Sequence, residues 1–182
     1  MRKLLLAMYM SLDGFIEGPN REFTGPPFTP DLKSKWIDVN IDRAGIMLYG
    51  RTAYEGMAGY WTSPAADPDE AAILAKADKI VFSTTLQRAD WGNVRIIGSD
   101  IAGEVARLKA EPGRDLVLFG GAVIATSLLG LGLVDEMRLL VSPLLMGGGK
   151  RLFQGGYPRS KWTLHSAEPF DSGGVLLSYG LS

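Results

Sequence analysis

The chain contains no cysteine and only one histidine, His165, among its 182 residues. Disulfides, zinc–thiolate sites, iron–sulfur clusters and cysteine nucleophiles are therefore excluded. A single imidazole also cannot supply a site built from several histidines, so we expect no metal ion. The sequence lacks the Gly-x-x-x-x-Gly-Lys-Ser/Thr loop, and no Gly-x-Gly-x-x-Gly follows its first apolar run. The two commonest nucleotide-binding fingerprints are thus absent.

Neither sign of charge predominates, because 19 Lys and Arg residues face 20 Asp and Glu residues. This balance argues against a nucleic-acid-binding protein and against one held on a membrane by basic residues. The uncharged run 116–134 is long enough to raise the question of a membrane span, but its four glycines favour a strand, a turn and a short helix. The apolar start of the chain has no signal-peptide cleavage pattern. We expect a soluble cytoplasmic protein.

Glycine, by contrast, is abundant, with 23 residues or about twice the average usage. The excess is expected in tight turns or where the backbone approaches a ligand. Hydrophobic residues make up 46% of the chain, which is enough for a packed core, and the length suits one domain over residues 1–182.

Apolar runs and helix-start signals alternate along the chain. Thr29, Asp67 and Ser99 each resemble the N-cap of a helix, and a further helix is expected at 122–129. Strands separated by helices imply a mostly parallel sheet, and the short loop 169–174 predicts a final antiparallel hairpin. The sequence therefore predicts one α/β domain with about eight strands. The predicted strands are 3–10, 46–49, 79–83, 94–97, 116–119, 134–142, 162–168 and 175–180.

Three predicted strand ends carry residues suited to phosphate. They are Gly50-Arg51-Thr52, Ser83-Thr84 and Gly120-Gly121-Ala122. Free amides at a helix start attract phosphate, and an arginine adds a bidentate contact. Each segment alone also fits an ordinary turn or close packing of helix on sheet. Together, at the carboxyl ends of parallel strands, they favour a long ligand with several phosphates.

Side chains suited to catalysis are few. His165 lies in a late predicted strand and is better explained as structural, and no Gly-x-Ser-x-Gly elbow supports a hydrolase. A cofactor that carries the reactivity itself fits this composition better.

The order of the motifs resembles that of the dihydrofolate reductase-like superfamily. It is most similar to the branch that includes the C-terminal reductase domain of riboflavin-biosynthesis deaminase-reductases and many bacterial relatives. The resemblance covers nearly the whole chain, and it depends on the set of motifs in this order rather than on any one of them. The motifs are Ser-Leu-Asp-Gly-Phe-Ile at 11–16, Gly-Arg-Thr-Ala-Tyr-Glu at 50–55, 80–86, Phe-Gly-Gly at 119–121, 133–136 and 143–150.

This resemblance implies a three-layer α/β/α fold around a mixed sheet, with NADPH as hydride donor. By motif match, residues 50–52 would contact the cofactor phosphates, and Ser83 and Thr84 would face the adenosine ribose and its 2′-phosphate. Residues 120–123 would hold the pyrophosphate, with Ile124 nearby. The segment 98–99 would approach the adenine. Ile16, which lies in the mobile loop after the first strand, would lie against the nicotinamide. The implied cofactor residues are Ile16, Gly50, Arg51, Thr52, Ser83, Thr84, Gly98, Ser99, Gly120, Gly121, Ala122, Val123 and Ile124.

Folate reductases also place a carboxylate on the first long helix, where it orients the pterin and assists protonation. Asp31 resembles that catalytic residue, although its spacing to Gly50 is longer here and a first-turn acid is also explained by the helix dipole. Asp38 is a weaker substitute. The resemblance implies an NADPH-dependent reductase acting on a C=N or C=O bond of a small pterin- or pyrimidine-like substrate, related to riboflavin precursors. The alternative is a non-catalytic nucleotide-binding module, and either could form a homodimer.

Overall fold

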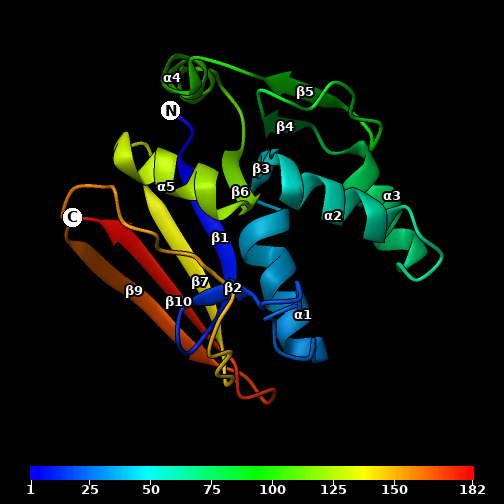
Figure 1. The fold of residues 1–182 in the computed structure, drawn as a ribbon, viewed down its shortest axis with the longest axis vertical. Helices are drawn as coiled ribbons and strands as arrows, with labels where there is room; N and C mark the ends of the chain where they lie inside the picture. Colours follow the sequence, from blue (N-terminus) through cyan, green and yellow to red (C-terminus); the bar gives the residue numbers. More distant parts are fainter.

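A computed structural model describes residues 1–182, and its centre is one eight-stranded sheet in the order β5-β4-β3-β6-β1-β7-β10-β9 (Figure 1). The first six strands of this order are parallel, and β10 is antiparallel to both of its neighbours. All eight predicted strands and the final hairpin are confirmed. The strands are β1 (Leu4–Ser11), β3 (Ala44–Gly50), β4 (Lys79–Phe82), β5 (Val94–Ile97), β6 (Asp115–Gly120), β7 (Glu136–Ser142), β9 (Trp162–Pro169) and β10 (Val175–Leu181).

Helices cover both faces of the sheet, which confirms the three-layer arrangement (Figure 1). One hydrophobic cluster joins α4 and α5 to the sheet, and a second joins α1, α2 and α3 to the opposite face. No helix combines the length and the apolar character that a bilayer crossing requires. The helices are α1 (Pro30–Trp36), which continues into the π-helical turn η1 (Ile37–Ile41), α2 (Arg51–Trp61), α3 (Pro68–Lys76), α4 (Ile101–Ala110) and α5 (Ala122–Gly130).

The central strand β1 explains why the strands read as continuous apolar runs. Leu4, Leu6 and Met8 belong to the cluster on the α4–α5 face, whereas Leu5 and Ala7 belong to the cluster on the α1–α3 face. Successive side chains of a strand point to opposite faces, so a strand covered on both sides must be apolar at every position.

Of two predicted helix N-caps, one is confirmed and the other is displaced by one residue. Asp67 caps α3 as predicted, since its carboxylate accepts hydrogen bonds from two first-turn amides at 3.1 Å each. The N-cap of α4 is Asp100 and not Ser99, because Asp100 Oδ1 accepts the N–H of Gly103 at 3.0 Å. Ser and Asp are nearly equivalent caps, so two adjacent candidates cannot be separated by residue type.

The segment after β1, expected as a plain mobile loop, contains the short strand β2 (Phe15–Glu17). It pairs with β8 (Lys150–Arg151) in a separate two-stranded sheet. Pairs of such short strands carry no periodic signal in a sequence. This small sheet attaches the end of β1 to the glycine-rich segment 147–149.

A buried ion cluster lies at the opposite, amino end of the central strands. Glu136, which is 6% exposed, accepts hydrogen bonds from Lys3 at 2.6 Å and from Arg138 at 3.1 Å, and pairs with Arg43 at 3.4 Å. Burial acts to raise the pKa of Glu136, but the Lys3 hydrogen bond and the two arginines outweigh it and hold the pKa below its ordinary value. The charged form therefore stabilises the fold.

We predict that Glu136→Gln lowers the free energy of unfolding by about 3 kcal/mol at pH 7, because it leaves Arg138 buried without its full partner. Since the folded pKa of Glu136 lies below the ordinary 4.5, the contribution is complete above that pH and fades as the pH falls below it. Urea unfolding at pH 7 and pH 3 measures both effects. A constant difference between variant and wild type at the two pH values would contradict this account.

Candidate functional site

The carboxyl ends of the parallel strands bring the predicted motifs to one edge of the sheet. The register pairs Ile97 with Phe82, Phe82 with Gly50, and Tyr49 with Gly120. Neighbouring strands lie about 4.8 Å apart. The motif residues that follow these strand ends, far apart in the sequence, therefore form a row in the order β5, β4, β3, β6.

At the middle of this row, α2 and α5 begin beside each other (Figure 1). Their N-caps are Gly50 and Gly121, and a Cβ added to Gly121 would lie 3.1 Å from the Gly50 nitrogen and 2.8 Å from Cγ2 of Ile124. Gly121 also has φ +108°, a conformation that favours glycine. The first amides of both helices have no partner within their helix, so two partial positive charges meet at one place.

The side chains at these two helix starts divide into exposed and buried groups. Arg51 and Thr52 are exposed in the first turn of α2, and Val123 is 63% exposed in that of α5. Ala122 and Ile124 are buried and pack against the sheet. Neither first turn contains an acidic residue. The place where the two helices begin therefore offers a cationic side chain and free amides to an anion. Neither first turn contains a carboxylate that would repel it.

The ends of β4 and β5 also lie together. Ser83 Oγ accepts the N–H groups of Thr85 and Leu86 at 3.1 and 3.0 Å, so the hydroxyl closes a turn, and Thr84 beside it is exposed. A Cβ on Gly98 would lie 3.5 Å from the Ser83 carbonyl oxygen. Next to them, a cavity of about 410 Å³ is lined by residues of β5 and the start of α4, namely Ile96, Ile97, Gly98, Ser99, Asp100, Gly103, Glu104 and Arg107.

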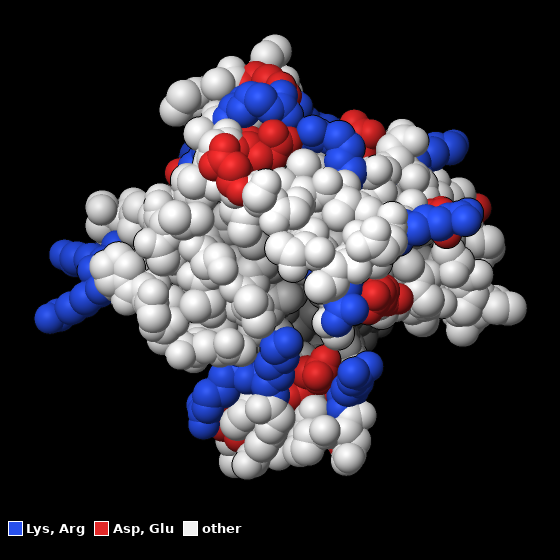
Figure 2. Space-filling model, turned by 45° about the horizontal axis from the view of Figure 1, so that its top comes forward, with Lys and Arg blue, Asp and Glu red and all other residues white.

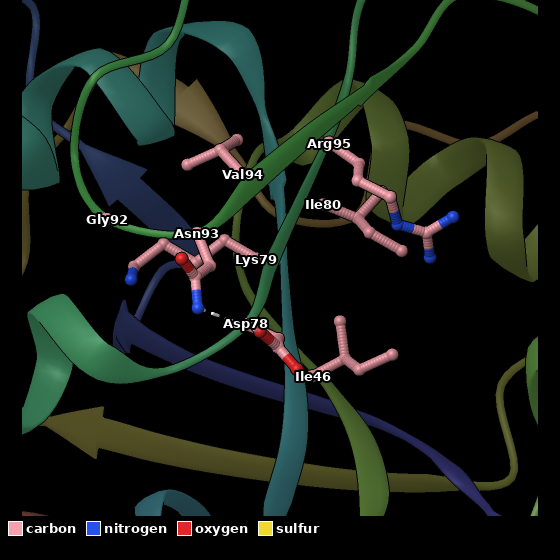
Figure 3. Close-up of a pocket in the computed structure, with 8 residues that line it drawn as sticks. All are labelled: Ile46, Asp78, Lys79, Ile80, Gly92, Asn93, Val94 and Arg95. Carbon is pink, nitrogen blue, oxygen red and sulfur yellow. Dashed lines mark hydrogen bonds between the residues drawn. The ribbon is translucent and has the colours of Figure 1, made fainter.

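A second cavity, of about 510 Å³, lies at the amino ends of β3, β4 and β5 and is separate from this row (Figure 3). Its buried Lys79 donates a hydrogen bond to the Ala77 carbonyl at 2.8 Å and lies 4.5 Å from the ring of Trp91. Burial lowers the pKa of Lys79 to about 8. These contacts close the end of α3, so this lysine has a structural role.

Asp13 is a residue of the first motif to which the sequence assigns no role. Its carboxylate accepts hydrogen bonds from the Ser11 hydroxyl at 2.6 Å and from the backbone N–H groups of Met146 and Gly147 at 3.1 and 2.8 Å. The Ser11 bond and these two backbone bonds lower the pKa of Asp13 to about 2. Asp13 therefore ties the end of β1 to the segment 143–149, which explains why both motifs occur together.

The remaining predicted residues, Ile16, Asp31 and Asp38, lie outside the row of strand ends. Ile16 is half-buried in β2, and its carbonyl accepts the Thr24 hydroxyl at 3.0 Å. Asp31 is exposed in the first turn of α1, and the neighbouring Thr29 hydroxyl lowers its pKa. Asp38 is exposed as well. A carboxylate that is ionised at neutral pH can orient a substrate N–H group, but it does not have the raised pKa of a general acid.

Charges of both signs are interspersed over the face drawn in Figure 2, and a hollow near its middle has Lys or Arg and Asp or Glu side chains at its rim. No broad field of one sign covers this face. Attraction for an anion would therefore be local and would come from the helix starts and Arg51.

The chain is similar to known proteins both in sequence and in fold. The RibD C-terminal domain family matches residues 2–176. The uncharacterized protein YyaP of Bacillus subtilis (strain 168) is 36% identical, over 98% of this chain and 94% of that protein.

Solved structures that share the fold include two named as reductases. One is a diaminohydroxyphosphoribosylaminopyrimidine deaminase/5-amino-6-(5-phosphoribosylamino)uracil reductase of Thermotoga maritima, with a TM-score of 0.71 and 15% identity over all of this chain and 57% of that one. The other is the dihydrofolate reductase of Enterococcus faecalis in complex with NADP(H) and RAB-propyl, with a TM-score of 0.66 and 14% identity over 99% and 96% of the two chains. The predicted dihydrofolate reductase-like fold is confirmed.

We predict that Gly121→Ala destabilises the protein by about 1–3 kcal/mol, because a Cβ is strained at φ +108° and collides with Ile124. Gly56→Ala is the matched control, since Gly56 lies inside α2 with open space around it and should gain about 0.5–1 kcal/mol. Urea unfolding of both variants measures the difference. Equal effects of the two substitutions would show that the approach of Gly50 and Gly121 is not a tight constraint.

Proposed function

The chain belongs to the RibD C-terminal domain family of reductases, and we propose that it is an NADPH-dependent reductase that transfers hydride to a C=N or C=O bond of a small pyrimidine- or pterin-like heterocycle. The observation that carries the proposal is the meeting of the α2 and α5 helix starts at Gly50 and Gly121. Two sets of free amides, brought together where Gly121 leaves no room for a side chain, suit a pyrophosphate.

The residues present fit a dinucleotide along the row of strand ends. Gly120, Gly121 and the first amides of α5 would hold the pyrophosphate, with Val123 at the surface beside it. At the start of α2, Arg51 would hold the 2′-phosphate of the adenosine ribose and Thr52 another phosphate oxygen. Ser83, Thr84, Gly98 and Ser99 would border the adenosine half, next to the 410 Å³ cavity. When bound, NADPH supplies the hydride, and the chain supplies binding, orientation and exclusion of water.

The relatives support both parts of this proposal. The Enterococcus faecalis dihydrofolate reductase, which shares the fold, is described with NADP(H), and the Thermotoga maritima protein is named a reductase of a substituted uracil. A pyrimidine or a pterin is a planar ring with a reducible C=N or C=O bond. Asp31, ionised, would orient an N–H group of such a ring, and water would supply the proton that accompanies the hydride.

The surroundings of Asp31 also favour a second candidate, a nucleotide-binding module without turnover. An exposed carboxylate with a lowered pKa is a poor proton donor, and no buried acid lies among the residues assigned to the row. The two candidates share the nucleotide site and differ only in whether the bound nucleotide is consumed.

We predict that Arg51→Ala weakens NADPH binding about 10- to 100-fold, as expected for loss of a charge-assisted hydrogen bond to phosphate. NADH, which lacks the 2′-phosphate, should lose much less. Isothermal titration of both nucleotides measures the two affinities, with Arg159→Ala, another exposed arginine, as control. Equal losses for NADPH and NADH would remove Arg51 from the 2′-phosphate contact.

We also predict that the purified protein consumes NADPH in the presence of at least one planar heterocycle from a panel of oxidised pterins, dihydropterins and ribitylaminopyrimidines. Loss of the nicotinamide absorbance follows the reaction. NADPH binding without consumption by any member of the panel would instead support the non-catalytic module. Absence of NADPH binding would reject both candidates.

A further inference from the structure

The sheet has two border strands, β5 and β9, and they differ in how well they are protected from pairing with another chain. β5 is four residues long and carries the charged Arg95 within it. β9 is eight residues long, and no Lys, Arg, Asp or Glu lies between Trp162 and Ala167. In Figure 1, neither a helix nor a strand runs along the outer side of β9. A long border strand without such protection is a template for a further strand.

Free backbone groups line the outer side of β9. Lys161 and Phe170, which flank β9, form backbone hydrogen bonds of 3.1 and 2.9 Å with the two residues that flank β10. Residues of an antiparallel strand direct their N–H and C=O groups alternately to one side and to the other. Counted inward from these two ends, Trp162, Leu164 and Ala167 direct theirs away from β10. No turn or loop of the chain forms a backbone hydrogen bond with these three residues.

The alternation is interrupted once, at His165. Leu164 and Ser166 pair with consecutive residues of β10, so His165 is an extra residue, a β-bulge, in β9. The bulge sets Leu164 and Ala167 three positions apart, whereas Trp162 and Leu164 are two positions apart. Another strand must match this spacing, which limits the registers in which β9 can pair with a copy of itself.

One register that matches the spacing sets Leu164 of two copies opposite each other on a two-fold axis. Trp162 then lies opposite Ala167 of the second copy, so that a large side chain meets a small one. Lys161 lies opposite Glu168 of the second copy, and opposite charges in such positions stabilise a pair of strands. β9 is therefore complementary to itself in size and in charge.

The side of the β9–β10 hairpin that adjoins the α4–α5 cluster supplies an apolar surface for this contact. Leu164 is 51% exposed there, and Ala167 is exposed as well. Pairing of two copies removes part of this surface from water, which favours association. No polar or charged residue other than the tyrosine belongs to this side, which consists of Trp162, Leu164, Ala167 and Pro169 of β9 and Val175, Leu177, Tyr179 and Leu181 of β10.

We propose that two copies of this chain associate through β9, which pairs antiparallel with β9 of the second copy about a two-fold axis at Leu164. The two sheets then join into one continuous sheet. Because the same strand of both copies is used, the contact closes on itself and stops at a dimer. The row of strand ends from β5 to β6 lies on the other half of each sheet and stays open.

Sedimentation of the full chain from about 1 to 100 µM tests the association, and we expect the wild type to be a dimer in this range. Leu164→Lys should weaken the dimer at least about tenfold, because it sets two like charges opposite each other on the axis. Leu181→Lys is the matched control, since Leu181 is 48% exposed on the same side of the hairpin but lies on β10. It should leave the association unchanged.

A second variant tests the register through charge. Glu168 already pairs with Lys35 of its own chain at 2.9 Å, so the substitution is made at Lys161. Lys161→Glu should weaken the dimer severalfold, because it sets two carboxylates opposite each other. Lys76→Glu, at an exposed lysine of α3, changes the net charge equally and should have no effect. Equal dimer affinities of these two variants would overturn the register.

A wild type that stays monomeric over the whole range would overturn the proposal. Loss of the dimer in both leucine variants would assign the contact to packing of the apolar side, and its persistence in both would assign it to another surface. Either result overturns the pairing of β9. Thermal unfolding confirms that each variant is folded, and Lys161→Glu carries the test if Leu164→Lys does not fold.

Discussion

The close approach of two glycine backbones, Gly50 and Gly121, is the constraint on which the rest of the site depends. It allows α2 and α5, which cover opposite faces of the sheet, to begin at the same place. Free amides of two helices then point to one region, where their partial charges add. A side chain at Gly121 would collide with Ile124 and press on the Gly50 backbone, and so would separate the two strand ends.

The parallel sheet extends this constraint into a continuous edge. From β5 to β6 the strand ends offer glycines, hydroxyls and free amides, whereas near the end of β1 the ring of Tyr9 stacks on that of Trp36. The change occurs at β1, where Asp13 holds the following turn against the segment 143–149 and where Tyr9 lies level with Gly121. The part of the edge from β5 to β6 thus carries groups of the kind that bind phosphate.

The sequence predicted the regular elements well because the strands are covered on both faces and are therefore apolar throughout. It was less informative where the signals are short. The pairing of β2 with β8 involves too few residues for a period, and the choice between Ser99 and Asp100 as N-cap depends on geometry. The contacts of the Tyr9 ring with Phe23, Phe28 and Trp36 were not predicted, because Tyr9 reads as one more apolar residue of β1 and Phe23 and Phe28 lie in an irregular segment.

What the sequence determined by itself was the set of strands, their mostly parallel order, the final hairpin and the motifs that end each strand, since these follow from local polarity, spacing and turn chemistry. Only the tertiary structure decided which strand ends become neighbours. That decision places Gly50 against Gly121, gives Asp13 its partners at 146 and 147, and stacks Tyr9 on Trp36. Contacts of this kind join residues many tens of positions apart, and no local pattern of polarity contains them.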